Sequence, residues 1–228
     1  MTKKQFVSIG KLLLPSLQGY VVDGSIVFRP PVGHTLSGLC FERRETADSF
    51  YLWVFLMPLC IPEDHITLSF GKRLGGGSHS WEASSRELIP SLLDAVDREA
   101  IPFLEGLETP GDVVSRIQNL NLPKDAFYRY EALGYMLARC GRPKEAIANL
   151  DRTIELLGDG RAGRCGIMVD RGKVTCVPLG PRPEWEKRAK DRAATLRDRL
   201  INDPVAVPLL LGSWEQESLR NLGLLGYR

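Results

Sequence analysis

The chain has 228 residues, a formal net charge of +2 and a hydrophobic fraction of 43%. A chain of this length and composition is typical of a soluble globular protein that folds without stabilising disulfide bonds or metals. The small net charge excludes binding to nucleic acid through overall charge alone, and the longest apolar run, residues 50–61, is far shorter than the ~20 residues of a membrane helix.

The first third of the chain alternates short apolar segments with turn residues. Residues 5–18 carry apolar side chains at helical spacing and predict a short amphipathic helix. The Asp23-Gly24 pair between two apolar segments predicts a tight β-hairpin. Residues 50–56 are apolar on both alternating faces, which is typical of a central strand covered on both sides. Further strands are expected over 36–41 and 66–70, so this region predicts an antiparallel meander behind an N-terminal helix.

After the glycine-rich residues 75–78 the pattern becomes helical. Thr109-Pro110-Gly111-Asp112 has the order of an N-cap, a first-turn proline and a capping acid, and it predicts a helix start. Ser213 with Gln216 predicts the start of a last helix, which Gly223 would end. Helices are also expected over 84–104, 127–157 (as a hairpin) and 184–201, with a small β-hairpin at 170–173.

Helices that follow strands, without alternation between the two, favour an α+β fold over a doubly wound sheet. We therefore predict a subdomain with an antiparallel sheet over residues 1–82 and a helical subdomain over residues 83–228. Because the connector between them is short, the two parts can share one core as a single domain.

The most specific segment is the helical hairpin at residues 127–157. Six of its residues resemble the tetratricopeptide pattern at its most constrained positions: Tyr130, Leu133, Gly134, Gly141, Ala146 and Leu150. Leu137 and Thr153 depart from that pattern, and no second copy follows, so a repeat array is not expected. Two interpretations stay open: a hairpin that only packs the core, or a peptide-binding surface that neighbouring helices extend.

The N-terminal half resembles a group of uncharacterised bacterial α+β proteins. The resemblance lies in GYVVDGSIVFRPP (residues 19–31), FYLWVFLMPLCIP (50–62) and LSFGKRLGG (68–76). Some members of the group lie near toxin–antitoxin or toxin–immunity genes, so the resemblance implies a protein partner such as a toxin. The group has no known catalytic residues that could be carried over to this chain.

One glycine-rich segment, Gly71–Ser78, follows a predicted strand and precedes a helix. Glycine amides and two neighbouring cations could hold a phosphate, although the segment has neither the GxxxxGK[ST] nor the GxGxxG spacing. A flexible connector between the sheet and the helices explains the same residues. If a small anionic ligand binds this chain, we expect it at Lys72, Arg73, Gly75, Gly76, His79 and Trp81.

No constellation of catalytic residues stands out. The three histidines follow no metal-binding spacing, and Glu63-Asp64-His65 is more simply explained as a polar turn. The five cysteines include no CxxC pair, although Cys165 and Cys176 could face each other across a hairpin. Residues 182–199 interleave basic and acidic side chains, as a solvated helix face does. We predict no catalytic residue, no metal and no cofactor, and we favour a protein that is not an enzyme.

These observations favour a non-catalytic, cytoplasmic bacterial protein of the interaction or immunity type, which binds another protein. The alternative is a protein or enzyme that binds a small anionic ligand through Gly71–Ser78. Binding to membranes or nucleic acid is not expected. The apolar residues 209–211 and 222–227 leave a homo-oligomer open. The sequence leaves open whether the three tryptophans expected at the surface, Trp81, Trp185 and Trp214, mark an interface.

Overall fold

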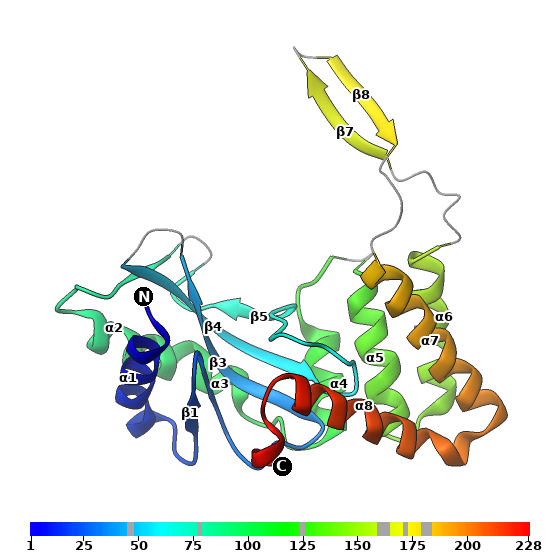
Figure 1. Ribbon diagram of the computed structural model, residues 1–228, viewed down its shortest axis with the longest axis horizontal. Helices are drawn as coiled ribbons and strands as arrows, with labels where there is room; N and C mark the ends of the chain where they lie inside the picture. Colours follow the sequence, from blue (N-terminus) through cyan, green and yellow to red (C-terminus); the bar gives the residue numbers. More distant parts are fainter. Residues whose placement is uncertain (45–47, 77–78, 124–125, 159–164, 171–172, 179–183) are drawn as a thin grey trace. The chain divides into compact units, whose positions relative to one another are not determined.

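The computed structural model describes residues 1–228 except 45–47, 77–78, 124–125, 159–164, 171–172 and 179–183, and it describes 165–170 and 173–178 by their backbone alone. The chain divides into two compact units (Figure 1). The N-terminal unit comprises Met1–Leu120 together with Gly212–Arg228, and the helical unit comprises Asn121–Leu211. This division differs from the expected boundary between residues 82 and 83, because three more helices and the last residues belong with the sheet.

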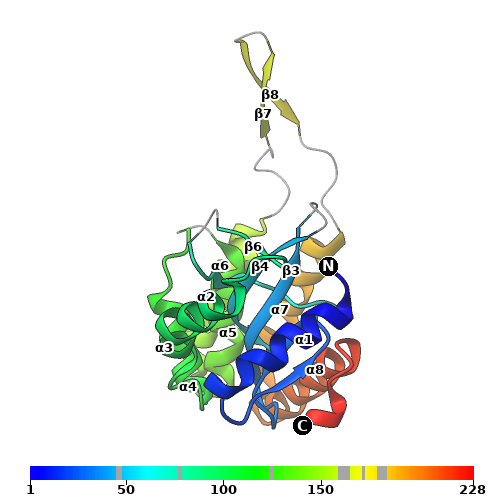
Figure 2. The same ribbon diagram turned by 90° about the vertical axis from the view of Figure 1, so that its left-hand side faces the viewer.

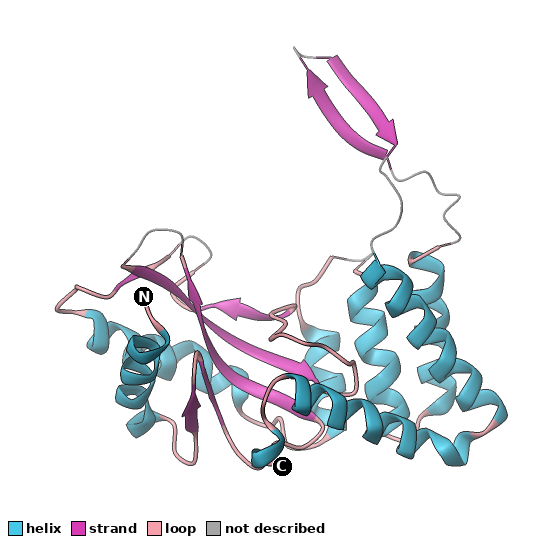
Figure 3. Ribbon diagram, in the orientation of Figure 1, coloured by secondary structure: helices cyan, strands magenta, loops and turns pink. Residues whose placement is uncertain are grey.

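The N-terminal unit contains a six-stranded antiparallel sheet, so the fold is α+β, as predicted (Figure 3). The strands follow in the order β1-β2-β3-β4-β5. The short strand β6 pairs with β4 along the edge that also pairs with β5. The predicted hairpin is present, and Gly24 in its turn has a φ of +61°. The strands are β1 (Val21–Asp23), β2 (Ile26–Phe28), β3 (Thr35–Arg43), β4 (Ser49–Pro58), β5 (Phe70–Arg73) and β6 (Trp81–Glu82).

The fifth strand begins where the sequence predicted that it would end. Ile66 and Leu68 do not pair with a strand and instead pack, partly buried, against the core. Gly71 is paired with Phe55 of β4, and a Cβ atom at Gly71 would lie 2.6 Å from the carbonyl oxygen of Val54. The close approach explains a glycine in a strand. Residues 71–73 are therefore part of the sheet and not of a connecting loop.

An N-terminal helix, α1 (Lys3–Leu13), covers one face of the sheet (Figure 2). The ring of Phe6 stacks on Phe41 at a centroid distance of 5.4 Å and meets Phe50 edge-on at 5.9 Å. A capping box between Thr2 and Gln5 starts this helix. The predicted helix is confirmed, but it is followed by a separate 3-10 turn, η1 (Leu14–Ser16).

The C-terminal residues cover the opposite face. Helix α8 (Val207–Asn221) brings Leu219 into the core, and the ring of Tyr227, in the turn η4 (Leu225–Tyr227), meets Phe28 edge-on at 5.0 Å. The hydroxyl of Ser218 donates to the carbonyls of Leu59 and Ile61. This core cluster contains Ile26, Phe28, Val32, Leu36, Cys40, Phe55, Met57, Leu59, Leu219 and Leu224.

The start of the last helix was predicted at the wrong residue. Helix α8 begins at Val207, directly after the 3-10 turn η3 (Pro204–Ala206), so Ser213 lies inside the helix and is not its N-cap. The predicted end is confirmed, because Gly223 follows the helix with a φ of +73°. The pair of Ser213 and Gln216 therefore does not determine where α8 begins.

Three further helical elements belong to the N-terminal unit. Helix α2 (Leu88–Ala95) continues through the π-helical turn η2 (Val96–Ala100) into α3 (Ile101–Leu104), and Pro90 lies in the first turn of α2. Helix α4 (Pro110–Asn119) begins with the predicted cap. There the Asp112 amide donates to the Thr109 hydroxyl over 3.3 Å, and the Asp112 carboxylate accepts the Thr109 amide over 2.7 Å.

The helical unit is built on the predicted hairpin. Helices α5 (Phe127–Arg139) and α6 (Pro143–Leu156) pack closely, since a Cβ atom at Gly134 would lie 2.8 Å from the Leu150 side chain. Gly141 allows the turn between them with a φ of +69°. Helix α7 (Glu184–Asn202) packs against α6.

A small β-hairpin is inserted between α6 and α7, where the sequence predicted one. Its strands, β7 (Cys165–Asp170) and β8 (Lys173–Pro178), pair with Asp170 opposite Lys173. The register places Ile167 opposite Cys176 and Pro178 opposite Cys165. The two cysteines are therefore not directly opposed, and their side chains lie outside the described part of the chain.

Burial of Cys40 makes the stability of the N-terminal unit sensitive to alkaline pH. Burial, with a smaller effect of Glu42, raises the pKa of the Cys40 thiol from its ordinary value of 9.0 to about 12. Above pH 9 the unfolded chain loses this proton and the folded chain keeps it, so unfolding becomes more favourable as the pH rises towards 12. Between about pH 8 and about pH 10, the wild type should lose about 1 kcal/mol more stability than Cys40→Ala, measured by urea unfolding. Equal losses in the two proteins would contradict this.

Candidate functional site

The two cations predicted to bind an anion lie on opposite faces of the sheet. Lys72 and Arg73 are successive residues of β5, and successive side chains of a strand alternate between its faces. The Lys72 ammonium lies 3.5 Å from the Glu99 carboxylate, and the Gly75 amide donates to the same carboxylate over 3.0 Å. A carboxylate of the protein thus engages the cation and the amide that the prediction assigned to a ligand.

Arg73 belongs to an aromatic group on the other face. Its guanidinium lies 3.8 Å from the centre of the Tyr51 ring and 4.9 Å from that of Trp53. The Glu42 carboxylate lies 3.6 Å from the same guanidinium and accepts a hydrogen bond of 2.7 Å from the Trp53 indole. Cation–π contacts of this kind fix both the cation and the rings, which places Arg73 in the packing of the sheet.

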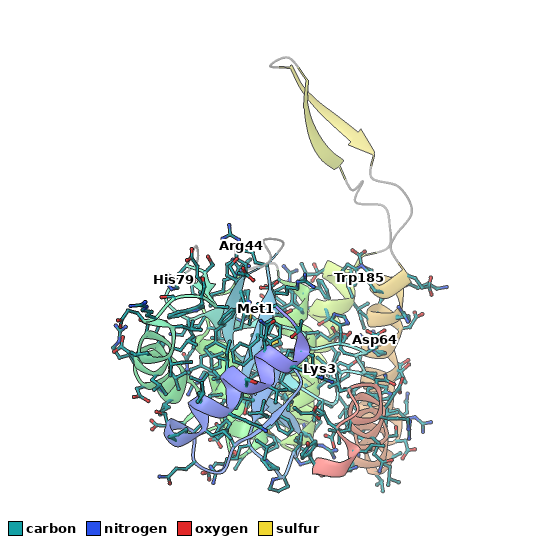
Figure 4. The ribbon with its side chains drawn as sticks, turned by 60° about the vertical axis from the view of Figure 1, so that its left-hand side comes forward. Met1, Lys3, Arg44, Asp64, His79 and Trp185 are labelled. Carbon is teal, nitrogen blue, oxygen red and sulfur yellow. The ribbon has the colours of Figure 1, made fainter. Side chains whose placement is uncertain are left out.

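The remaining predicted residues partly come together at a cleft of about 450 Å³. Gly75, His79 and Trp81 all line it, and the two rings meet edge-on at 4.4 Å. His79 is marked in Figure 4. Gly76 has a φ of +95° and does not line this cleft, while Gly77 and Ser78 lie outside the described residues.

The surface position expected for the tryptophans is correct only in part. Trp81 is buried, with 7% of its surface exposed, because it pairs with Phe50 across β4 and β6. Trp214 is half-buried, and Trp185 is 48% exposed.

The residues that resemble the tetratricopeptide pattern serve the contact between α5 and α6. Leu133, Ala146 and Leu150 are buried, with Gly134 in the close contact described above. Tyr130 is half-buried, with the Arg152 guanidinium 5.9 Å from its ring centre. Gly141 makes the turn. These six residues build the hairpin, and a binding surface has to come from other side chains.

Such side chains gather where α5 and α7 begin, in an aromatic cluster of Phe127, Tyr128 and Trp185. Phe127 stacks on Trp185 with a centroid distance of 5.6 Å and an interplanar angle of 28°, and it meets Tyr128 edge-on at 5.8 Å. Figure 4 marks Trp185 at the start of α7. The sequence signal was present, since Phe127 to Tyr130 contains three aromatic residues, but the pairing with a residue of α7 was not predicted.

A buried ion pair connects α5 and α7 further along. The Arg192 guanidinium lies 3.4 Å from the Glu131 carboxylate, whose side chain is only 5% exposed. A buried carboxylate is stable only when it is paired and hydrogen-bonded. This contact therefore fixes the two helices that carry the aromatic cluster.

Another cleft, of about 750 Å³, was not predicted. It lies in the N-terminal unit and is lined by residues 16–20, 29–37 and 101–113. His34 is on its wall, and the His34 Nδ1 atom lies 2.9 Å from Oε1 of the buried Glu215. The sequence could not indicate this pair, since 181 positions separate its members.

Glu63, Asp64 and His65 form the group of possible metal ligands found in the described part of the chain, with ligand atoms within 4.8 Å of one another. Asp64 and His65 are exposed, and Asp64 Oδ1 lies 2.7 Å from His65 Nδ1. Exposed carboxylates often cluster without a metal, so this arrangement alone does not define a site. Among the described helices, none is both long and apolar enough to span a bilayer.

In comparisons with models of protein families, with curated proteins and with solved structures, no match to this chain was found.

Proposed function

We propose that the protein is a non-catalytic interaction module that binds another protein through its helical unit. The observation that carries the proposal is the aromatic cluster of Phe127, Tyr128 and Trp185. Trp185 leaves 48% of a large side chain exposed while its ring is held against Phe127. Tryptophan and tyrosine side chains supply much of the binding energy of protein interfaces.

The surroundings of the cluster also favour binding. The Glu131–Arg192 pair and the close packing at Gly134 hold α5, α6 and α7 together. Stacking on Phe127 restricts the rotamers of Trp185 before any partner arrives, so less conformational entropy is lost on binding. We therefore infer that this surface is preorganised for binding and does not act through catalytic groups.

The alternative, an anionic-ligand site at Gly71–Ser78, has less support. Glu99 engages Lys72 and the Gly75 amide, and Arg73 lies on the other face of the sheet. The resemblance of the N-terminal half adds a narrower proposal, namely that the partner is a toxin and that the protein neutralises it. The product of a neighbouring toxin gene is therefore the first partner to test.

Replacing Trp185 by alanine is expected to weaken partner binding by about 30-fold or more, the effect of losing a central aromatic anchor. Ile201→Ala is the matched control, because Ile201 also lies on α7 and is 57% exposed. The partner is first captured in cells of the source organism with a photo-cross-linking amino acid at position 128. Its affinity for the wild type and both variants is then measured with purified proteins.

Two results would contradict the proposal. One is a cross-linking pattern from position 128 that equals the background of the unirradiated sample. The other is equal affinity of the captured protein for the wild type and the Trp185→Ala variant. Capture of a second copy of this chain alone would replace the proposal by a homo-oligomer.

A further inference from the structure

The cleft of about 750 Å³ beside His34 has the dimensions of a small-molecule site. Its volume of about 750 Å³ lies within the range of ~300–1,000 Å³ that such sites commonly have. Its lining comes from two parts of the chain, namely residues within 16–20 and 29–37 and residues within 101–113. All of these residues belong to the N-terminal unit, so the cleft is separate from the aromatic cluster.

The part of the lining from residues 16–37 offers a cation, a phenol and an oriented imidazole. Arg29 is exposed, and its guanidinium forms no ion pair within the described residues. Burial raises the pKa of the nearby Tyr20, and the charge of Arg29 opposes that rise. His34 is held through Nδ1 by the Glu215 carboxylate, which is 1% exposed. With Nδ1 engaged by Glu215, the ring offers its Nε2 atom to a ligand.

The part of the lining from residues 101–113 is acidic and is fixed by its own hydrogen bonds. Glu105 and Glu108 line it with exposed side chains that form no ion pair in the described part of the chain. The Arg116 guanidinium donates to the carbonyls of Phe103 and Glu105 over 2.5 and 3.1 Å. The capping box of Thr109 holds the other end of the connector. Both carboxylates therefore project from a turn that is ordered at its two ends.

We infer that this cleft binds a small zwitterion, either a free amino acid or a short peptide. Arg29 pairs with the carboxylate of the ligand, and Glu105 and Glu108 pair with its ammonium group. The Nε2 atom of His34 adds a further hydrogen-bonding group. A ligand with only one of the two charges would leave either Arg29 or the two glutamates without a partner, and hydrogen bonds to charged groups are stronger than those between neutral groups.

The test compares four probes by isothermal titration calorimetry with the full chain: trialanine, leucine, N-acetyl-trialanine and trialanine amide. Trialanine or leucine should bind at least about 10-fold more tightly than either capped peptide, which lacks one charge. The ratio of trialanine to leucine affinity distinguishes a peptide site from an amino-acid site. Backbone amide shifts at Gly33 and Gly106, which both line the cleft, locate the bound probe by nuclear magnetic resonance.

Variants assign the two charges separately. Arg29→Ala should weaken binding of the better zwitterion at least about 10-fold, and Glu105→Gln with Glu108→Gln should do the same. Arg86→Ala is the control, since Arg86 is an exposed arginine of the same unit outside the cleft. All four substituted residues are exposed, so thermal melting should not change. Absence of binding, equal binding of the capped peptides, or an Arg29→Ala variant with wild-type affinity would each overturn the inference.

Discussion

A chain truncated after Leu211 is expected to lose the folded state of its N-terminal unit. The deletion removes Leu219 and Leu224, which are 0% and 1% exposed and lie in the core cluster with Phe28 and Met57. Each buried leucine contributes about 2–5 kcal/mol. Their combined loss approaches the whole stability of a typical domain, about 5–15 kcal/mol.

Lost polar contacts add to this effect. The backbone amide of Val32 donates to the Tyr227 carbonyl over 2.7 Å, and the Ser218 hydroxyl donates to the Leu59 carbonyl over 2.8 Å. In nuclear magnetic resonance spectra of the truncated chain, the amide signals of the N-terminal unit should lose their chemical-shift dispersion. The truncated chain should also bind a hydrophobic dye. A synthetic peptide of residues 212–228, added in trans, should restore the spectrum.

Point variants test the same contribution of the C-terminal residues without a deletion. Leu219→Ala should lower the free energy of unfolding by about 3 kcal/mol in urea titrations. Leu225→Ala is its control, because Leu225 is 47% exposed and follows the same helix, and it should change stability by less than about 0.5 kcal/mol. If the truncated chain unfolded at the same urea concentration as the full chain, the C-terminal residues would not be needed to cover this face of the sheet.

Gly38→Ala should be the most damaging single methyl addition in the sheet. A Cβ atom at Gly38 would lie 2.0 Å from the carbonyl oxygen of Val27 and 3.0 Å from the Cα atom of Phe28. Both are backbone atoms of β2, which is paired with β3 on one side and with β1 on the other. They cannot move away without disturbing both pairings, so we expect a loss of about 3 kcal/mol or more.

Gly33→Ala is the matched control for this variant. Gly33 shortly precedes β3, the strand that contains Gly38. Nothing lies within 4 Å of a Cβ atom added at Gly33, and its φ is outside the left-handed region. This substitution should leave stability unchanged or raise it by up to about 1 kcal/mol, because alanine restricts the unfolded chain. Urea unfolding of both variants tests the prediction. Equal midpoints would mean that β2 accommodates a side chain at position 38 of the neighbouring strand β3.

Features determined by neighbouring residues were predictable from the sequence. The turn at Gly24, the two apolar faces of β4 and the capping box at Thr109 each depend on residues within a few positions, and each is present. The helical hairpin of α5 and α6 belongs to the same group, because its spacing of apolar and small residues repeats at three and four.

Features determined by distant residues were not predictable in the same way. The alternation of Ile66, Leu68 and Phe70 is real, but pairing with β4 starts only at Phe70. Ser213 matched a capping pattern, yet packing and the preceding turn let α8 begin six residues earlier, at Val207. The return of residues 212–228 to the first unit has no local signature.

The candidate sites show the same limit. Lys72 and Arg73 suggested one cationic site because they are adjacent, and strand geometry then separates adjacent side chains. His34 and Glu215 have no relation in the sequence, and the fold brings them within hydrogen-bonding distance. Predicting either result requires knowing first which residues form the sheet and which segment covers it.

The discontinuous N-terminal unit also determines when it can fold during translation. Residues 1–120 leave the ribosome with one apolar face of their sheet uncovered, and the segment that covers it, Gly212–Arg228, is synthesised only after the whole helical unit. Exposed sheet surface of this kind promotes aggregation and recruits chaperones. The nascent chain must therefore keep this face protected for the time that synthesis of residues 121–211 takes.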